Sequence, residues 1–213
     1  MLNMPSRFVT RRLTGNTYYH VYNRGVFEQN IFKEPADYEK FLYYLYIYVT
    51  NPTEIAQKYP DLPTRLRRKN LFNDVFCISY VLMPNHFHLL VKQTGDASMP
   101  VLMKQLINGY TTFFNTKYNH HGAILEGRYK SMKIESEYLL TQMVRFVHLN
   151  PSISGLVQDP KDYQWSGYSN PIFGRGVMNR FENATEWTNF HLDKAGYDAN
   201  FEKIRDLTID SER

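Results

Sequence analysis

Apolar and polar residues alternate with a period that changes along the chain, and each change predicts an element of secondary structure. Residues 17–23 (TYYHVYN) are rich in β-forming side chains and precede Arg24 and Gly25, which is typical of a strand that ends in a turn. Over residues 35–49, apolar side chains recur every three or four positions and predict an amphipathic helix. Residues 51–70 are polar, and we expect a surface loop with a solvated cluster of basic side chains.

The rest of the chain to residue 149 shows the same two kinds of pattern. Runs rich in β-forming side chains predict strands at residues 74–83, 86–92 and 128–134. Apolar side chains spaced three or four residues apart predict helices at residues 100–118 and 137–149. The turn dipeptide Pro84-Asn85 joins the first two of these strands into a hairpin. We expect Ser136 to cap the last helix, because its hydroxyl can accept a bond from an unpaired amide there, and Pro151 to end it.

The predicted order of elements is β-α-β-β-α-β followed by a further helix. This order is typical of a ferredoxin-like α+β domain, an antiparallel sheet with helices on one face. We expect one domain over residues 1–155, with a basic N-terminal arm. Residues 156–213 lose the periodicity, and we expect an extension that packs on the domain or on its ligand.

Composition narrows the class of protein. A hydrophobic content of 43% with 15% aromatic residues is ample for a folded core. Cys77 is the single cysteine, and residues 1–14 contain no apolar segment of a secretion signal, so we expect a cytoplasmic protein. The apolar run at residues 41–49 is too short to span a bilayer. The net charge of +4 is compatible with nucleic acid and is a weak signal alone.

His86 and His88, one residue apart at the start of a predicted strand, are the most informative polar residues. Successive side chains of a strand point to opposite faces, so both histidines lie on one face and Phe87 on the other. Two imidazoles in this arrangement can bind one divalent cation. Exposed or hydrogen-bonded strand histidines would give the same pattern.

A third ligand for such a cation has to come from another element. Asn150 lies at the end of the last predicted helix, and its side-chain oxygen is a hard ligand. Phe146 lies one turn earlier on the same helical face, because residues four apart are stacked. Both residues also have purely structural interpretations, Asn150 as a helix end before proline and Phe146 as a core aromatic.

These residues lie within motifs that resemble a known family. The hairpin YVLMPNHFHLLV at residues 80–91 resembles the HUH motif of single-strand DNA nucleases, in which a bulky apolar residue separates two histidines. More specifically, the chain resembles the REP-associated single-tyrosine transposases of the HUH superfamily over about residues 16–170. Four further motifs carry this resemblance, in order along the chain: NRG at 23–25, GRYKS at 127–131, VHLNP at 147–151 and WSGY at 165–168.

The resemblance implies a ferredoxin-like HUH nuclease domain with His86, His88 and Asn150 as ligands of Mg²⁺ or Mn²⁺. It also implies a nucleophilic tyrosine one turn before the polar ligand, and this chain has Phe146 there. The tyrosine attacks a phosphodiester to form a 5′-phosphotyrosine, for which phenylalanine has no oxygen. As an inactive Tyr-to-Phe form, engineered or natural, the chain is expected to bind DNA without cutting it.

The implied partner is a DNA hairpin of a repetitive extragenic palindrome with a single-stranded flank, bound by a monomer. Basic side chains fix the register on phosphates without reading sequence. The candidates for these contacts are Arg11, Arg12, Arg24, Arg65, Arg67, Arg68, Arg128, Lys130 and Lys133.

Two other classes of function fit part of the sequence. A ferredoxin-like nucleic-acid binding module without catalysis would explain the charge and the aromatic residues, but not the placing of His86, His88 and Asn150 as a metal triad. A zinc hydrolase lacks the expected carboxylate or cysteine ligands and a general base.

Overall fold

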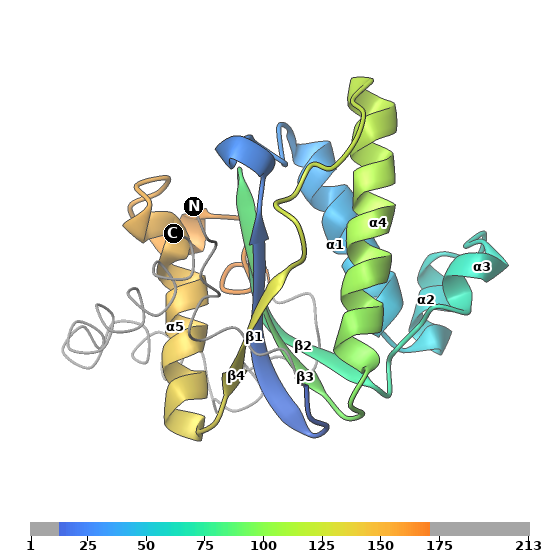
Figure 1. Ribbon diagram of the computed structural model, residues 1–213, viewed down its shortest axis with the longest axis horizontal. Helices are drawn as coiled ribbons and strands as arrows, with labels where there is room; N and C mark the ends of the chain where they lie inside the picture. Colours follow the sequence, from blue (N-terminus) through green and yellow to red (C-terminus); the bar gives the residue numbers. More distant parts are fainter. Residues whose placement is uncertain (1–12, 171–213) are drawn as a thin grey trace, which may run out of the picture.

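The computed structural model describes residues 13–170, which form an α+β fold with a four-stranded antiparallel sheet and five α-helices (Figure 1). The strands are β1 (Thr17–Arg24), β2 (Val75–Met83), β3 (His86–Gln93) and β4 (Lys130–Ile134). The helices are α1 (Pro35–Val49), α2 (Pro52–Lys58), α3 (Thr64–Arg67), α4 (Ser98–Tyr118) and α5 (Glu137–Ile153), with short 3₁₀ turns η1 (Val26–Glu28) and η2 (Pro160–Asp162).

The strand order β2-β3-β1-β4 confirms the predicted ferredoxin-like class. Strand β3 is central and pairs with both β2 and β1. In the β1 register, Arg24 lies opposite His86 and Tyr22 lies opposite His88. The end of β1 and the start of β3 therefore bring the NRG motif beside the histidine pair.

The sheet is covered on both faces, and each face has its own core. Helices α1 and α4 cover one face and α5 covers the other (Figure 1). The expectation of helices on one face is thus wrong for α5. The physical reason is in β3, where Phe87, Leu89 and Val91 join the α1–α4 core while Leu90 joins the α5 core. A strand that is apolar on both sides requires cover on both sides.

Two local expectations are also wrong. The segment predicted as a surface loop at residues 51–70 contains α2 and α3. Asn51 caps α2 by accepting a bond from the Thr53 amide, and the buried side chain of Ile55 anchors this helix. Helix α5 also continues through Pro151 to Ile153, since a proline this close to the helix end removes only one internal bond.

Residues 165–167 pair with the open edge of β2. The Leu82 amide donates to the Trp165 carbonyl, and the Gly167 amide donates to the Tyr80 carbonyl. Trp165 stacks on Tyr38 of α1 with ring centroids 4.6 Å apart. The WSGY motif is therefore a structural element of the domain edge. The rest of the expected extension, residues 171–213, lies outside the described residues, as does most of the N-terminal arm.

No helix within residues 13–170 is both long enough and apolar enough to cross a membrane. The longest, α4, is an amphipathic helix whose buried side chains belong to the core it shares with α1.

A buried carboxylate ties α1 to α4. Asp37 is fully buried and accepts bonds from the Lys117 ammonium, from the Tyr118 hydroxyl at 2.7 Å and from the Lys33 amide at 2.8 Å. Burial raises the pKa of this carboxyl, but the hydrogen bonds outweigh that effect, and the net pKa lies below its usual value. The ionised form therefore stabilises the fold.

We expect Asp37→Asn to lower the free energy of unfolding at neutral pH by about 2 kcal/mol, because the charge-assisted bonds are lost. A carboxyl with a depressed folded pKa contributes stability above its unfolded pKa of about 4, and this contribution is lost as the pH falls through the folded pKa. Urea unfolding of both proteins should show a difference that shrinks below about pH 4. Asp159→Asn, which breaks an exposed pair with Lys161, is the control, and an equally large effect there would contradict the assignment.

Candidate functional site

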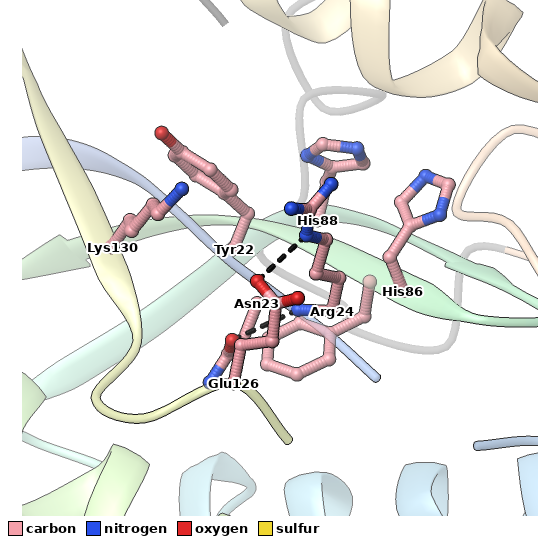
Figure 2. A pocket seen from close by; sticks show the side chains of 8 residues that line it. Tyr22, Asn23, Arg24, His86, His88, Glu126 and Lys130 are labelled. Atoms are coloured by element: carbon pink, nitrogen blue, oxygen red, sulfur yellow. Dashed lines mark hydrogen bonds and ion pairs between the residues drawn. The ribbon is translucent and has the colours of Figure 1, made fainter. Parts of the chain in front are cut away.

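His86 and His88 project from the same side of β3, toward α5 (Figure 2). Their ring centroids lie 5.1 Å apart and the rings are nearly perpendicular. His88 is buried and His86 is half-buried, at the end of the sheet where β1 stops. The alternation of β3 thus places both imidazoles on the face expected from the sequence.

Helix α5 brings Asn150 and Phe146 to the same pair. The Asn150 side chain is buried and lies in hydrogen-bonding reach of the His86 ring. The Phe146 ring packs edge-on against His88, with centroids 5.2 Å apart. The four side chains expected to form the site are therefore neighbours. Tyr138, two turns earlier on α5, is exposed.

The electrostatics of the cluster suit a cation ligand set. Burial lowers the pKa of His86 to about 4; a hydrogen bond with Asn150 opposes this shift and the charge of Arg24 adds to it. Burial also lowers the pKa of His88 well below its usual value, with further contributions from His20 and His86. Both imidazoles are therefore neutral at pH 7, the form in which histidine binds a metal.

The Asn150 side-chain oxygen gives the site a ligand that suits a hard divalent ion. Within residues 13–170, no group of three His, Cys, Asp or Glu side chains is arranged to hold a metal. A site here consequently needs Asn150, and its Oδ1 is buried without a hydrogen-bond partner. A buried acceptor with no donor is costly unless a ligand satisfies it. The residues present therefore fit a divalent cation, and by ligand type alone zinc or nickel as well as magnesium or manganese.

His20 is a member of the cluster that the sequence analysis did not single out. It lies on β1, is fully buried, and its Nε2 is 2.9 Å from His88 Nδ1. Its ring also stacks on Tyr22 and meets the edge of Phe146. The signal was present in the first strand, because His20, Tyr22 and Arg24 share one face by their spacing.

A small hollow opens beside the histidines at the end of the sheet (Figure 2). Its volume of about 10 Å³ is room for about one water molecule or ion. Arg24 and Lys130 line it, and the Arg24 Nε donates to Glu126 Oε2 at 2.7 Å. Positive charge thus lies at the rim of the candidate site, held in place by an acidic neighbour.

The backbone at Gly25, in the NRG motif, passes too close to a neighbouring segment for any residue with a Cβ atom. The Gly25 amide donates to the Asn85 carbonyl at 2.7 Å, and the Glu126 amide donates to the Arg24 carbonyl at 2.8 Å. A Cβ added at Gly25 would lie 2.1 Å from the Gln29 carbonyl oxygen. Only glycine allows the backbone to pass this close, so the turn that positions Arg24 depends on it.

The other predicted DNA contacts lie in different surroundings. Arg65 lines a hollow of about 510 Å³ between α1, α3 and α4, together with Lys69 and Lys104. The Arg67 guanidinium donates to the carbonyls of Leu62 and Pro60, which fixes it to the local chain.

The remaining members of this set have few features in common. Arg68 is the C-cap of α3, the Arg128 guanidinium lies over the Tyr129 ring, and Lys133 pairs with Glu135 at 3.6 Å. Arg11 and Arg12 lie outside the described residues. Of the predicted contacts within residues 13–170, only Arg24 and Lys130 line the hollow beside the histidines.

Comparisons with known proteins show the fold. No protein-family model and no curated protein matches the sequence. A solved structure of a REP-associated tyrosine transposase bound to a REP hairpin is similar, with a TM-score of 0.50 and 14% identity, over 78% of this chain and 85% of that chain. A second structure, of a Deinococcus radiodurans protein described as a candidate transposase, has a TM-score of 0.37 and 15% identity, over 68% of this chain and 95% of that chain.

The first of these likenesses confirms that the resemblance indicated by the motifs extends to the fold of the chain. At 14% identity it shows the fold alone, and the second likeness is too low in TM-score to support an argument. The class defined by the fold is therefore the ferredoxin-like domain seen in a tyrosine transposase.

We expect Gly25→Ala to lower the free energy of unfolding by about 2 kcal/mol, because its new methyl group would clash with backbone rather than with a movable side chain. Urea unfolding checks this. Gly95→Ala is the matched control, since a Cβ there meets only the Ser98 hydroxyl, at 3.3 Å. Equal stability of the two variants would show that the turn relaxes freely.

Proposed function

We propose that this protein binds a DNA hairpin with a single-stranded flank and carries the site of an HUH tyrosine transposase without its nucleophile. The observation that supports this most directly is the meeting of four side chains from β3 and α5. His86 and His88 share a face, Asn150 presents a buried oxygen without a partner, and Phe146 lies edge-on to His88. The similarity in fold to a transposase bound to a REP hairpin supports the same proposal.

His86, His88 and Asn150 are the residues that would hold Mg²⁺ or Mn²⁺. When bound, the ion supplies polarisation of the scissile phosphate and stabilises charge on its oxygens. The two neutral imidazoles add no negative charge to the site, which leaves it favourable for a phosphate. Arg24 and Lys130 at the rim attract that phosphate and orient the strand.

Residue 146 decides between binding and cleavage. With a tyrosine there, the phenol would lose its proton, bond to phosphorus and release the 3′ oxygen, which takes up a proton. The product is a 5′-phosphotyrosine that conserves the bond for rejoining. Phe146 lacks the attacking oxygen, so the chain as it stands binds DNA and does not cut it.

The basic hollow between α1, α3 and α4 is a second region for DNA backbone contact. Arg65, Lys69 and Lys104 line it together with Tyr44 and Tyr48, and no carboxylate appears in its lining among the described residues. It lies on the helical side of the sheet opposite α5 (Figure 1). A DNA that reaches both regions has to extend beyond the reacting strand, as a hairpin stem does. We expect the protein to act as a cytoplasmic monomer.

We expect Phe146→Tyr to create a single-strand endonuclease that depends on Mg²⁺ or Mn²⁺. The substitution adds one oxygen to a ring that already contacts His88, so the fold should tolerate it. The measurement is a denaturing gel of labelled hairpin DNA with a single-stranded flank, on which a covalent protein–DNA adduct migrates slowly. Blunt duplex of the same length is the substrate control and should give no adduct.

The double variant Phe146→Tyr, Asn150→Ala provides the protein control, because it keeps the phenol and removes the third ligand. It should bind the hairpin and form no adduct. If the tyrosine form gives neither adduct nor cleavage with either metal while it still binds the hairpin, the non-catalytic binding module becomes the better description. If the unaltered chain already cleaves, the nucleophile lies elsewhere.

We expect Lys104→Ala to weaken binding of hairpin DNA evenly across sequences and to reduce the slope of log K against log salt by about 0.9, the value for one lost phosphate contact. Fluorescence anisotropy over a range of salt concentrations measures this slope. Lys92→Ala serves as the control, since Lys92 does not line this hollow and its ammonium lies over the Tyr18 ring of β1. Equal slopes for Lys104→Ala and the unaltered chain would remove the hollow from the DNA-binding surface.

A further inference from the structure

The buried His20 ring packs against Tyr22, His88 and Phe146, a role that does not require its polar atoms. Its cross-strand neighbours are Leu90 on β3 and Met132 on β4, and both belong to the apolar core under α5. An apolar side chain would fill this place without polar atoms, whereas the His20 Nδ1 is buried with no hydrogen-bond partner. The one polar contact shown for the His20 ring joins its Nε2 to His88 Nδ1 at 2.9 Å.

The protonation of this pair follows from simple chemistry. Both rings are buried and the two nitrogens lie 2.9 Å apart, so a single proton lies between them. One ring therefore donates and the other accepts. If His20 accepts, the His88 proton is on Nδ1 and its Nε2 keeps a lone pair. If His20 donates, the His88 proton is on Nε2 and that nitrogen cannot bind a cation.

His86 provides an internal comparison. Its Nδ1 lies 2.7 Å from the Asn85 side-chain oxygen, which can only accept. The His86 proton is therefore on Nδ1, and its Nε2 keeps the lone pair. The neighbouring residue thus fixes one histidine of the pair in the form that a metal ligand needs.

We infer that His20 is a positioning residue that fixes His88 in the corresponding form, by accepting the Nδ1 proton and holding the plane of its ring. This inference rests on the proposed function, because a metal site is what requires His88 in this form. The geometry comes from the buried 2.9 Å contact between His20 and His88. Metal-binding histidines generally donate their second N–H to such an outer partner, most often a carboxylate, a carbonyl or water.

The choice of a neutral partner has a consequence of its own. A carboxylate at position 20 would place a negative charge in a buried layer next to a site that receives a phosphate. A neutral imidazole fixes the same proton and adds no repulsion. Phe146 packs edge-on against both rings, so His20 and His88 are also held against residue 146, where the family has its nucleophilic tyrosine.

Nitrogen-15 NMR of the histidine side chains in the full, metal-free chain tests the inference directly, because the two forms differ strongly in ring nitrogen shifts. We expect His88 to carry its proton on Nδ1, with a coupling across the bond to His20 Nε2. A proton on His88 Nε2 would overturn the inference. This experiment involves neither DNA nor metal, so its result is separate from that of the cleavage test.

Two variants separate positioning from packing. His20→Phe keeps a ring of similar size and removes the acceptor, so His88 should revert to the Nε2–H form that free histidine prefers. His20→Gln places an amide oxygen near the former Nε2 and should keep the His88 proton on Nδ1. An unchanged His88 in the phenylalanine variant would overturn the inference. If that variant does not fold, the glutamine variant and the unaltered chain still decide the question.

Binding of Mn²⁺ alone, followed by electron paramagnetic resonance, supplies a second measurement. We expect His20→Phe to weaken it at least about tenfold and His20→Gln to restore most of the loss. Tyr110→Phe is the control, because it removes a buried hydrogen bond to the Ile31 carbonyl on the opposite side of the sheet. Unchanged affinity in His20→Phe would contradict the inference. An unaltered chain with the expected His88 form that binds no Mn²⁺ would contradict the proposed function instead.

Discussion

The alternation of side chains along β3 is the constraint on which the rest of the structure depends. Because the sheet is covered on both sides, every residue of this central strand is committed to one of two layers. Phe87 packs in the α1–α4 core, and the alternation of side chains therefore places His86 and His88 in the other layer, under α5. A shift of one residue in the pairing with β1 would exchange the layers and bury both imidazoles in the apolar α1–α4 core.

The polar layer under α5 is stable because its groups satisfy one another. Ser79 on β2 bonds to His148 on α5, and His20 bonds to His88, so most polar atoms in this layer have a partner. Asn150 is an exception beside the histidines, because its Oδ1 is buried without a hydrogen-bond partner. Buried groups that remain unpaired in an otherwise satisfied layer mark the place where a ligand completes the structure.

Most of the fold could be predicted from the sequence, because strong periodicity identified the four strands and α1, α4 and α5. Helices α2 and α3 were missed, since they are short and bury little beyond Ile55. The continuation of α5 past Pro151 was missed, because proline disrupts the interior of a helix but is tolerated in its last turn. For the candidate site, motif spacing pointed to His86, His88 and Asn150, which the fold brings together. His20 escaped because its partner lies 68 residues away and only strand pairing joins them.

The WSGY segment has a consequence for assembly. Unpaired edge strands are the usual places at which sheets of separate molecules join. Here the Leu82 amide and the Tyr80 carbonyl on β2 are already engaged by Trp165 and Gly167. An incoming strand would have to displace that segment, including the Trp165 ring stacked on Tyr38. Strand addition at residues 80–82 of β2 would therefore have to break contacts within the same molecule, which disfavours association through this part of the edge.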